Sequence, residues 1–134
     1  MPTMTKTKTK APAVPKLRQF IGGRWVEGSG DREMSSTNPA DTREVVATFR
    51  NASPADAIKA IDAAEAAAVG WRDTPAPQRG RIIVKAVEIA RRRLPELARL
   101  MTREQGKILS EATGELEKGI NLLEWFSGEG YRFM

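Results

Sequence analysis

The hydrophobic pattern of the chain changes its period at Asn51, and this change limits the possible folds more than any other feature. Before Asn51, apolar residues form short β-branched and aromatic runs between turn residues, which is typical of strands. After Asn51 they recur every three or four residues, which is typical of helices with one buried face. The 134 residues have the length of one domain. We therefore predict a mostly α-helical segment: a short β-hairpin and one further strand, followed by four helices.

The predicted β part is organised around glycine and proline. The pair Gly22-Gly23 separates Phe20-Ile21 from Arg24–Val26, and this spacing predicts a tight hairpin whose turn residues can need positive φ. Residues 32–37 are expected to be extended. Residues 43–50 are rich enough in β-branched and aromatic side chains to form the further strand.

Capping residues and prolines set the predicted helix boundaries. Ser53-Pro54 begins the first helix, which is expected to end at Gly70. Pro77 opens the second. A proline inside a helix costs about 3 kcal/mol, so Pro95 predicts a break and a third helix over Pro95–Gln105. Ser110 is expected to cap the fourth helix.

The net charge of +5 comes from the N-terminus. Residues 1–19 hold five of the 22 Lys and Arg residues and no acid, which leaves 17 basic against 17 acidic residues in the remainder. We interpret residues 1–16 as a disordered basic tail and expect no specific nucleic-acid site in the neutral body. No apolar run is long enough to span a membrane. The absence of cysteine is typical of a cytoplasmic protein.

The amino-acid composition also excludes most kinds of catalytic site. With no Cys and no His, the chain offers no thiolate nucleophile, no histidine base and no common metal-ligand cluster. Gly128-Glu129-Gly130 resembles the start of a phosphate loop, but a helical pattern precedes it and the third glycine is missing, so we interpret it as a helix C-terminus. Arg91–Arg93, neutralised by neighbouring acids, predicts a solvated helix face.

Three strings in order resemble the opening quarter of an NAD(P)-dependent aldehyde dehydrogenase: Phe20–Trp25, Asn38-Pro39-Ala40 and Glu104–Lys107. Together with Glu124-Trp125-Phe126, they look most like the semialdehyde dehydrogenases, which oxidise succinic or 2-oxoglutaric semialdehyde. Asp41-Thr42-Arg43 stands where the family usually has Thr-Gly, so the turn there is expected to form differently.

The resemblance implies an α/β fold of which this segment is the N-terminal part, with residues 17–134 an incomplete part of the cofactor-binding domain. In the family, a thiolate attacks the aldehyde, a hydride passes to NAD or NADP, and the thioester is hydrolysed. The Cys, Glu and Asn of that reaction and the glycine-rich crossover have no counterpart here. We therefore predict no catalytic or cofactor-binding residue, no bound cofactor and no dehydrogenase activity in this chain alone.

The resemblance points to two further sites. In many relatives a monovalent cation lies between backbone oxygens before the Asn-Pro pair and an acid near the Gly-Lys pair, which here are Ser36, Thr37 and Glu104. The fourth helix borders the substrate entrance in the family, so Lys118 and Trp125, seven positions apart, become entrance residues. Trp125 also suits a buried core position, and this is the interpretation that we favour.

In full-length relatives, these helices pack on a sheet whose strands this sequence does not contain. We therefore expect an uncovered apolar face on the last helix, which favours aggregation, self-association or docking to the remainder of the enzyme. The alternative function is a small helical protein-interaction module without catalytic activity. The sequence leaves open which small-molecule aldehyde is the substrate, which nicotinamide cofactor is used, and whether the short chain is a genuine product or a truncated reading frame.

Overall fold

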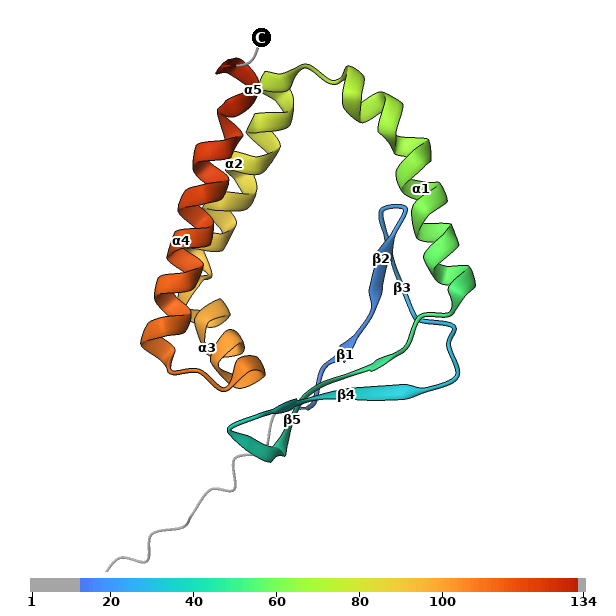
Figure 1. Cartoon of the computed structure of the whole chain (residues 1–134), viewed down its shortest axis with the longest axis vertical. Helices are drawn as coiled ribbons and strands as arrows, with labels where there is room; N and C mark the ends of the chain where they lie inside the picture. Colours follow the sequence, from blue (N-terminus) through green and yellow to red (C-terminus); the bar gives the residue numbers. More distant parts are fainter. Residues whose placement is uncertain (1–12, 133–134) are drawn as a thin grey trace, which may run out of the picture.

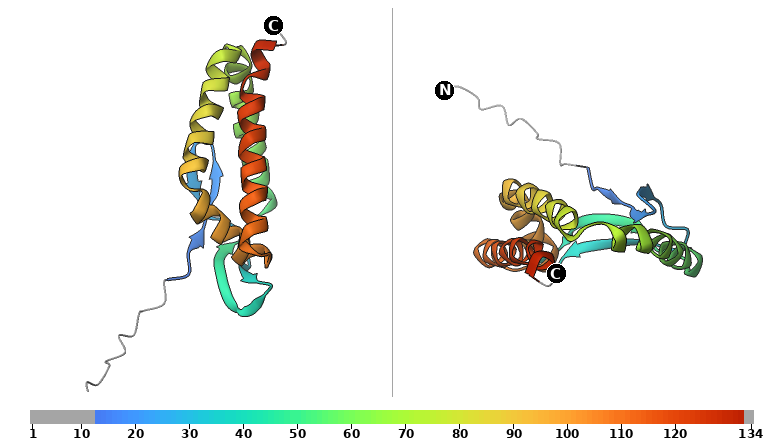
Figure 2. Two further views of the ribbon diagram at one scale, coloured as in Figure 1. Left: turned by 90° about the vertical axis from the view of Figure 1, so that its left-hand side faces the viewer. Right: turned by 90° about the horizontal axis from the view of Figure 1, so that it is seen from above.

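The computed structural model describes residues 13–132, in which five strands precede five helices. The strands are β1 (Lys16–Leu17), β2 (Gln19–Ile21), β3 (Arg24–Val26), β4 (Glu33–Asn38) and β5 (Asp41–Arg50), and the helices are α1 (Pro54–Asp73), α2 (Ala76–Arg92), α3 (Leu94–Gln105), α4 (Leu109–Ser127) and α5 (Glu129–Arg132). The molecule is an open arch: α1 stands apart from the paired helices α2 and α4, and the strands cross between the two arms (Figures 1 and 2). The predicted mostly helical fold with a hairpin near its start is confirmed.

The strands form two small sheets. In the first, β5 lies between antiparallel β4 and parallel β1. The second is the predicted hairpin of β2 and β3, whose turn residues Gly22 and Gly23 have φ of 57° and 77°. The expected disordered tail, residues 1–16, lies mostly outside the described residues, but Lys16 at its end pairs with Thr48 of β5. The short parallel strand β1 was not expected.

A capping network begins α1. The Ser53 hydroxyl accepts the Asp56 backbone N–H, and the Asp56 carboxylate accepts hydrogen bonds from the backbone N–H of Ser53 and from both the N–H and the hydroxyl of Ser29. These bonds hold the pKa of Asp56 far below its ordinary value, the Ser53 and Ser29 backbone groups contributing most. The predicted start of this helix is confirmed.

The predicted end of the first helix at Gly70 is wrong, because α1 continues to Asp73. A glycine within a helix costs only about 1 kcal/mol, and nothing in this part of the fold requires the chain to turn there. The helix ends instead at Thr74, which precedes Pro75 and is therefore extended, with ψ of 124°.

Helices α2, α3 and α4 contain most of the core. Val87, Ala98, Ala112 and Ile120 are buried where α2 and α3 pack on α4. The break before Pro95 is confirmed, and α3 ends at Gly106 in the left-handed conformation, with φ of 74°.

The predicted cap of the fourth helix at Ser110 is wrong. Ile108 is extended and its carbonyl accepts the Ala112 N–H, so α4 begins at Leu109 and Ser110 lies inside the first turn. An ion pair of 2.6 Å between Lys107 and Glu115 also fixes the start of this helix.

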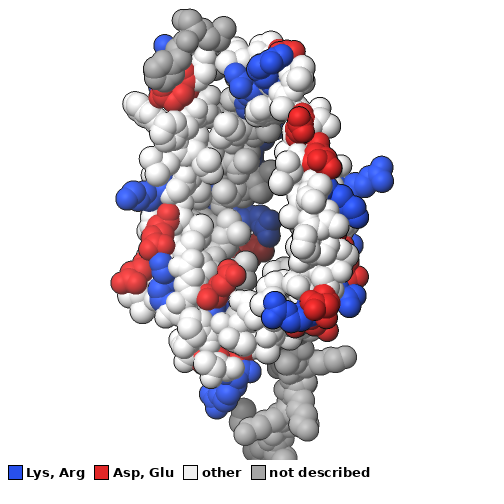
Figure 3. Space-filling model, turned by 45° about the vertical axis from the view of Figure 1, so that its right-hand side comes forward, with Lys and Arg blue, Asp and Glu red and all other residues white. Residues whose placement is uncertain are grey.

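The buried core is small for the apolar content of the chain. Among the described residues, six apolar residues are buried, whereas twenty large apolar residues between Val14 and Phe126 are more than a third exposed. Uncharged surface predominates on the face shown in Figure 3, with basic and acidic side chains scattered over it and along its margin. The described fold therefore leaves apolar surface open, as the sequence predicts for the last helix.

Candidate functional site

Two sequence motifs that lie far apart in the chain meet at the foot of the arch. The turn after Asn38 packs against the end of α3, where a side chain on Gly106 would lie 2.9 Å from Pro39 Cγ. Glu44 joins the two segments: it accepts a hydrogen bond of 2.8 Å from Asn38 Nδ2 and one of 2.7 Å from Arg103 Nε. These two bonds lower the pKa of Glu44 from its ordinary value.

The predicted cation ligands lie at this junction. Ser36 and Thr37 are on β4, at the position where its register with β5 shifts, and Glu104 is exposed in the last turn of α3, which packs against β4. No hydrogen bond connects the three residues within the described chain, and residues 13–132 contain no cluster of three or more acidic, His or Cys side chains able to hold a metal. The cation site therefore remains a prediction.

The predicted entrance residues are both on the outer side of α4. Lys118 is exposed, and Trp125 is 63% exposed with the Arg132 guanidinium 4.6 Å from its ring centroid. The interpretation of Trp125 as a core residue is therefore wrong in this chain, because the side of α4 that packs on α2 is occupied by Ala112 and Ile120. Leu122, Leu123 and Phe126 extend this exposed apolar surface.

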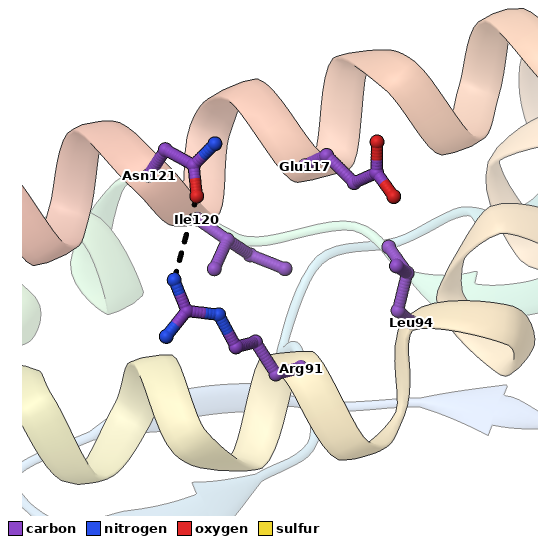
Figure 4. A pocket seen from close by; sticks show the side chains of 5 residues that line it. All are labelled: Arg91, Leu94, Glu117, Ile120 and Asn121. Atoms are coloured by element: carbon purple, nitrogen blue, oxygen red, sulfur yellow. Dashed lines mark hydrogen bonds between the residues drawn. The ribbon is translucent and has the colours of Figure 1, made fainter.

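An open pocket of about 420 Å³ lies between the end of α2 and the middle of α4 (Figure 4). Its polar lining residues are Arg91, Glu117 and Asn121. Arg91 donates to both carboxylate oxygens of Glu124, at 3.0 and 2.5 Å, and to Asn121 at 3.4 Å. This pairing raises the pKa of Arg91 and lowers that of Glu124. Because Arg91 is already paired, it is not poised to bind an anion; its partner Glu124 lies on α4 and is not one of the acids close to it in sequence that were expected to neutralise it.

A dinucleotide cradle does not fit the described residues. The helix start that follows a strand, at the beginning of α1, is already occupied by the Asp56 carboxylate, which would repel a phosphate. Gly128-Glu129-Gly130 connects α4 to α5, and a side chain on Gly130 would lie 2.7 Å from Ala76 Cβ. These glycines therefore end one helix and allow another to pack closely.

Comparison with known proteins identifies the family. The sequence profile of the aldehyde dehydrogenase family matches residues 25–134. The chain belongs to the aldehyde dehydrogenase family. This confirms the resemblance seen in the motifs.

The aldehyde dehydrogenases most similar to the chain include two curated semialdehyde enzymes and one solved structure. Alpha-ketoglutarate semialdehyde dehydrogenase of Haloferax volcanii is 38% identical over 112 residues, which are 84% of this chain and 23% of that protein. Malonate-semialdehyde dehydrogenase 2 of Geobacillus kaustophilus is 40% identical over 115 residues, 86% of this chain and 24% of that protein. An NAD-dependent benzaldehyde dehydrogenase from Corynebacterium glutamicum superposes with a TM-score of 0.82 at 34% identity, over 86% of this chain and 25% of that structure.

The chain thus spans about a quarter of the length of the curated aldehyde dehydrogenases that it matches, at their N-terminal part. No helix in the described part is long and apolar enough to cross a membrane.

Sequence reasoning missed the contacts between residues distant in the chain. Glu44 and Arg103 are 59 positions apart, and Arg91 and Glu124 are 33 apart. The sequence shows that these residues are charged but not which of them meet. Lys107 and Glu115 are only eight positions apart. A correct prediction that the fourth helix begins at Leu109 would have placed Glu115 in its second turn, where it can pair with Lys107.

Proposed function

We propose that this chain forms the N-terminal part of the cofactor-binding domain of an aldehyde dehydrogenase that oxidises a semialdehyde to the carboxylate with NAD or NADP. The observation that carries the proposal is a fold shared with complete aldehyde dehydrogenases together with a sequence that contains no cysteine to act as nucleophile. A semialdehyde is favoured by the names of the two curated relatives described above. We place the complete enzyme in the cytoplasm, where its catalytic thiol would stay reduced.

The role that we propose for these residues is structural. The bound nicotinamide cofactor would accept the hydride in the complete enzyme. The residues of this chain would form a wall of the domain, with the exposed side of α4 bordering the substrate entrance at Lys118 and Trp125. Ser36, Thr37 and Glu104 would hold a monovalent cation at the foot of the arch. The chain alone is expected to bind no cofactor and to oxidise no aldehyde.

The first test is an assay of purified residues 1–134 with NAD or NADP and with malonate or 2-oxoglutarate semialdehyde. We expect no cofactor reduction above the rate without protein, because no group in the chain can form the thiohemiacetal. Reduction that depends on both the aldehyde and this protein would contradict the proposal.

The second test asks whether these residues can serve in a complete enzyme. In a chimera, residues 17–134 replace the matching segment of malonate-semialdehyde dehydrogenase 2 from Geobacillus kaustophilus. We expect this chimera to fold and to reduce NAD(P) with malonate semialdehyde, and the matched control carries Ser in place of the catalytic Cys in the relative's part. A chimera that folds and binds the cofactor but cannot oxidise aldehyde would argue against the assigned place in the domain.

A protein-interaction module is the second candidate function, and the exposed surface around Leu122, Leu123 and Phe126 favours it. An interaction module would be a folded monomer in isolation and would recover a separate partner when co-purified. The aldehyde dehydrogenase proposal instead predicts that the isolated chain binds dyes specific for exposed apolar surface and self-associates as its concentration rises.

A further inference from the structure

Arg79 stands in the first turn of α2, at the point where the ends of α1, α4 and α5 approach this helix. It lines an open pocket of about 280 Å³ where α1 ends, α2 begins and α4 continues into α5, at the top of the arch in Figure 1. The other residues that line this pocket are Trp71, Ala76, Gly80, Ile83, Phe126, Ser127 and Gly130. Arg79 is therefore its one ionisable lining residue within the described chain.

The Arg79 Nε atom is buried and has no hydrogen-bond acceptor among the described residues. A buried donor without a partner loses its hydrogen bonds to water and gains none in return, so this atom strongly favours an acceptor. The acids on the neighbouring elements are already engaged: Asp73 pairs with Arg72 at 2.9 Å, and Glu129 accepts a bond of 2.9 Å from Arg132 Nε. The Arg79 guanidinium thus has no carboxylate partner among the described residues, although its Nε is buried.

The walls of the pocket define what else an occupant must carry. The Trp71 ring, 6.0 Å from the Arg79 guanidinium carbon, is 47% exposed, and Phe126 is 59% exposed. Both aromatic side chains border the open side of the pocket and would gain from apolar cover. An occupant therefore needs a carboxylate to meet Arg79 and apolar groups on either side of it.

We propose that this pocket binds a carboxylate, and that its occupant is an Asp or Glu side chain flanked by apolar residues on another polypeptide segment of the complete enzyme. A carboxylate can accept two parallel hydrogen bonds from a guanidinium, and this would satisfy Nε. Leu or similar side chains on either side would cover Trp71 and Phe126. This inference rests on the proposed function, because the partner segment belongs to the part of the aldehyde dehydrogenase beyond this chain.

The test is an NMR titration of the full 134-residue chain, in which the Nε–Hε resonance of Arg79 is followed. The probe is the peptide N-acetyl-Leu-Glu-Leu-amide, and the matched peptide has Gln in place of Glu. We expect a saturable shift of the Arg79 resonance with the Glu peptide and binding at least about tenfold weaker with the Gln peptide, because a charge-assisted pair is lost. Succinate, added at constant ionic strength, is expected to bind more weakly than the Glu peptide, since it cannot cover the aromatic walls.

Variants of the chain complete the test. Arg79→Gln is expected to weaken binding of the Glu peptide at least about tenfold, whereas Arg81→Gln, an exposed position on the same helix, leaves it unchanged. Binding to all variants is followed at the indole N–H resonance of Trp71, which lines the same pocket, because Gln and Lys carry no guanidinium Nε–H group. Arg79→Lys keeps the positive charge but lacks the planar guanidinium group that can donate two parallel hydrogen bonds. This variant is expected to bind the Glu peptide less tightly than the native chain does. Helix content by circular dichroism verifies that each variant folds.

Three results would overturn the inference. Equal binding of the Glu and Gln peptides would show that the pocket has no carboxylate site, and so would the absence of a saturable shift with either peptide. Binding of succinate as tight as that of the Glu peptide makes the site one for a small carboxylate and overturns the proposed occupant. Because the titration does not measure oxidation of an aldehyde, a positive titration with an inactive chimera would contradict the proposed function and leave the carboxylate site standing.

Discussion

The two arms of the arch are held in place by different physical means. Helices α2, α3 and α4 bury Val87, Ala98, Ala112 and Ile120 against one another. Helix α1 buries only Asp56, and its large apolar residues such as Ile61, which is 65% exposed, face outward. Its alanine-rich sequence favours helix formation, but its attachment depends on the cap at its start and on contact with β2. The comparison shows that one arm is stabilised by packing within the chain and the other mainly by local structure.

The largest difference between the arms should come from a core truncation. Ile120→Ala is expected to lower the stability of the α2–α4 arm by about 3 kcal/mol, because it removes buried apolar surface and leaves a cavity. The measurement is native-state hydrogen exchange, resolved by helix. Ile61→Ala on α1 is the control and should change protection by less than about 0.5 kcal/mol. Equal losses from both substitutions would show that the arms do not differ.

The next largest effect should come from the junction at the foot of the packed arm. Gly106→Ala places a side chain at φ of 74° and 2.9 Å from Pro39 Cγ, and should cost about 2 kcal/mol. Chemical denaturation is the measurement. Gly70→Ala, at a helical position with no atom within 4 Å of an added Cβ, is the control and should stabilise slightly. A neutral Gly106→Ala would mean that the motif junction is not tightly packed.

Acidification should loosen α1 before the packed arm. The pKa of Asp56 is lowered in the folded chain, so its stabilising contribution is complete above the ordinary pKa of 3.8 and is lost as the pH falls below that value. We expect the helicity of α1, followed by its ¹³Cα shifts, to decrease below about pH 4. Asp56→Asn should lower the helicity already at neutral pH and remove most of its pH dependence, whereas Asp62→Asn, an exposed position on the same helix, should not. An unchanged profile in Asp56→Asn would assign the loosening to other acids.

The smallest effect tests the uncovered side of α4. An added Cβ at Gly119 meets no atom within 4 Å, so Gly119→Ala should stabilise the isolated chain by about 0.5–1 kcal/mol. In the chimera the same substitution should lose this benefit if another element packs closely at Gly119. Thermal unfolding of both proteins is the measurement. Equal stabilisation of both would show that no element approaches α4 at this position.

Local signals allowed much of the fold to be predicted from the sequence. Ser53 caps α1, Pro95 separates α2 from α3, and Gly106 ends α3, because each acts within a few residues of itself. The predictions at Gly70 and Ser110 are wrong for a related reason, since both residue types favour helix ends but do not impose them. The first helix continues past Gly70 until Pro75 stops it, and the fourth helix begins before Ser110 because the loop after Gly106 ends at Ile108.

The candidate sites were less accessible to prediction. Family motifs indicated Ser36, Thr37 and Glu104, and the structure brings β4 and α3 together there. The Glu44–Arg103 contact and the unpartnered Nε of Arg79 depend on how distant segments pack, which periodicity does not encode. The exposure of Trp125 likewise reflects what lies beside α4 in space, not the apolar character of the residue.

The most direct test of the account is hydrogen exchange of α1 and of the outer side of α4, measured in the isolated chain and in the chimera. If these helices are the outer layer of an aldehyde dehydrogenase, their amides should exchange rapidly in the isolated chain and become strongly protected in the chimera, while those near Val87 change least. Protection of α1 that is already complete in the isolated chain would contradict this account.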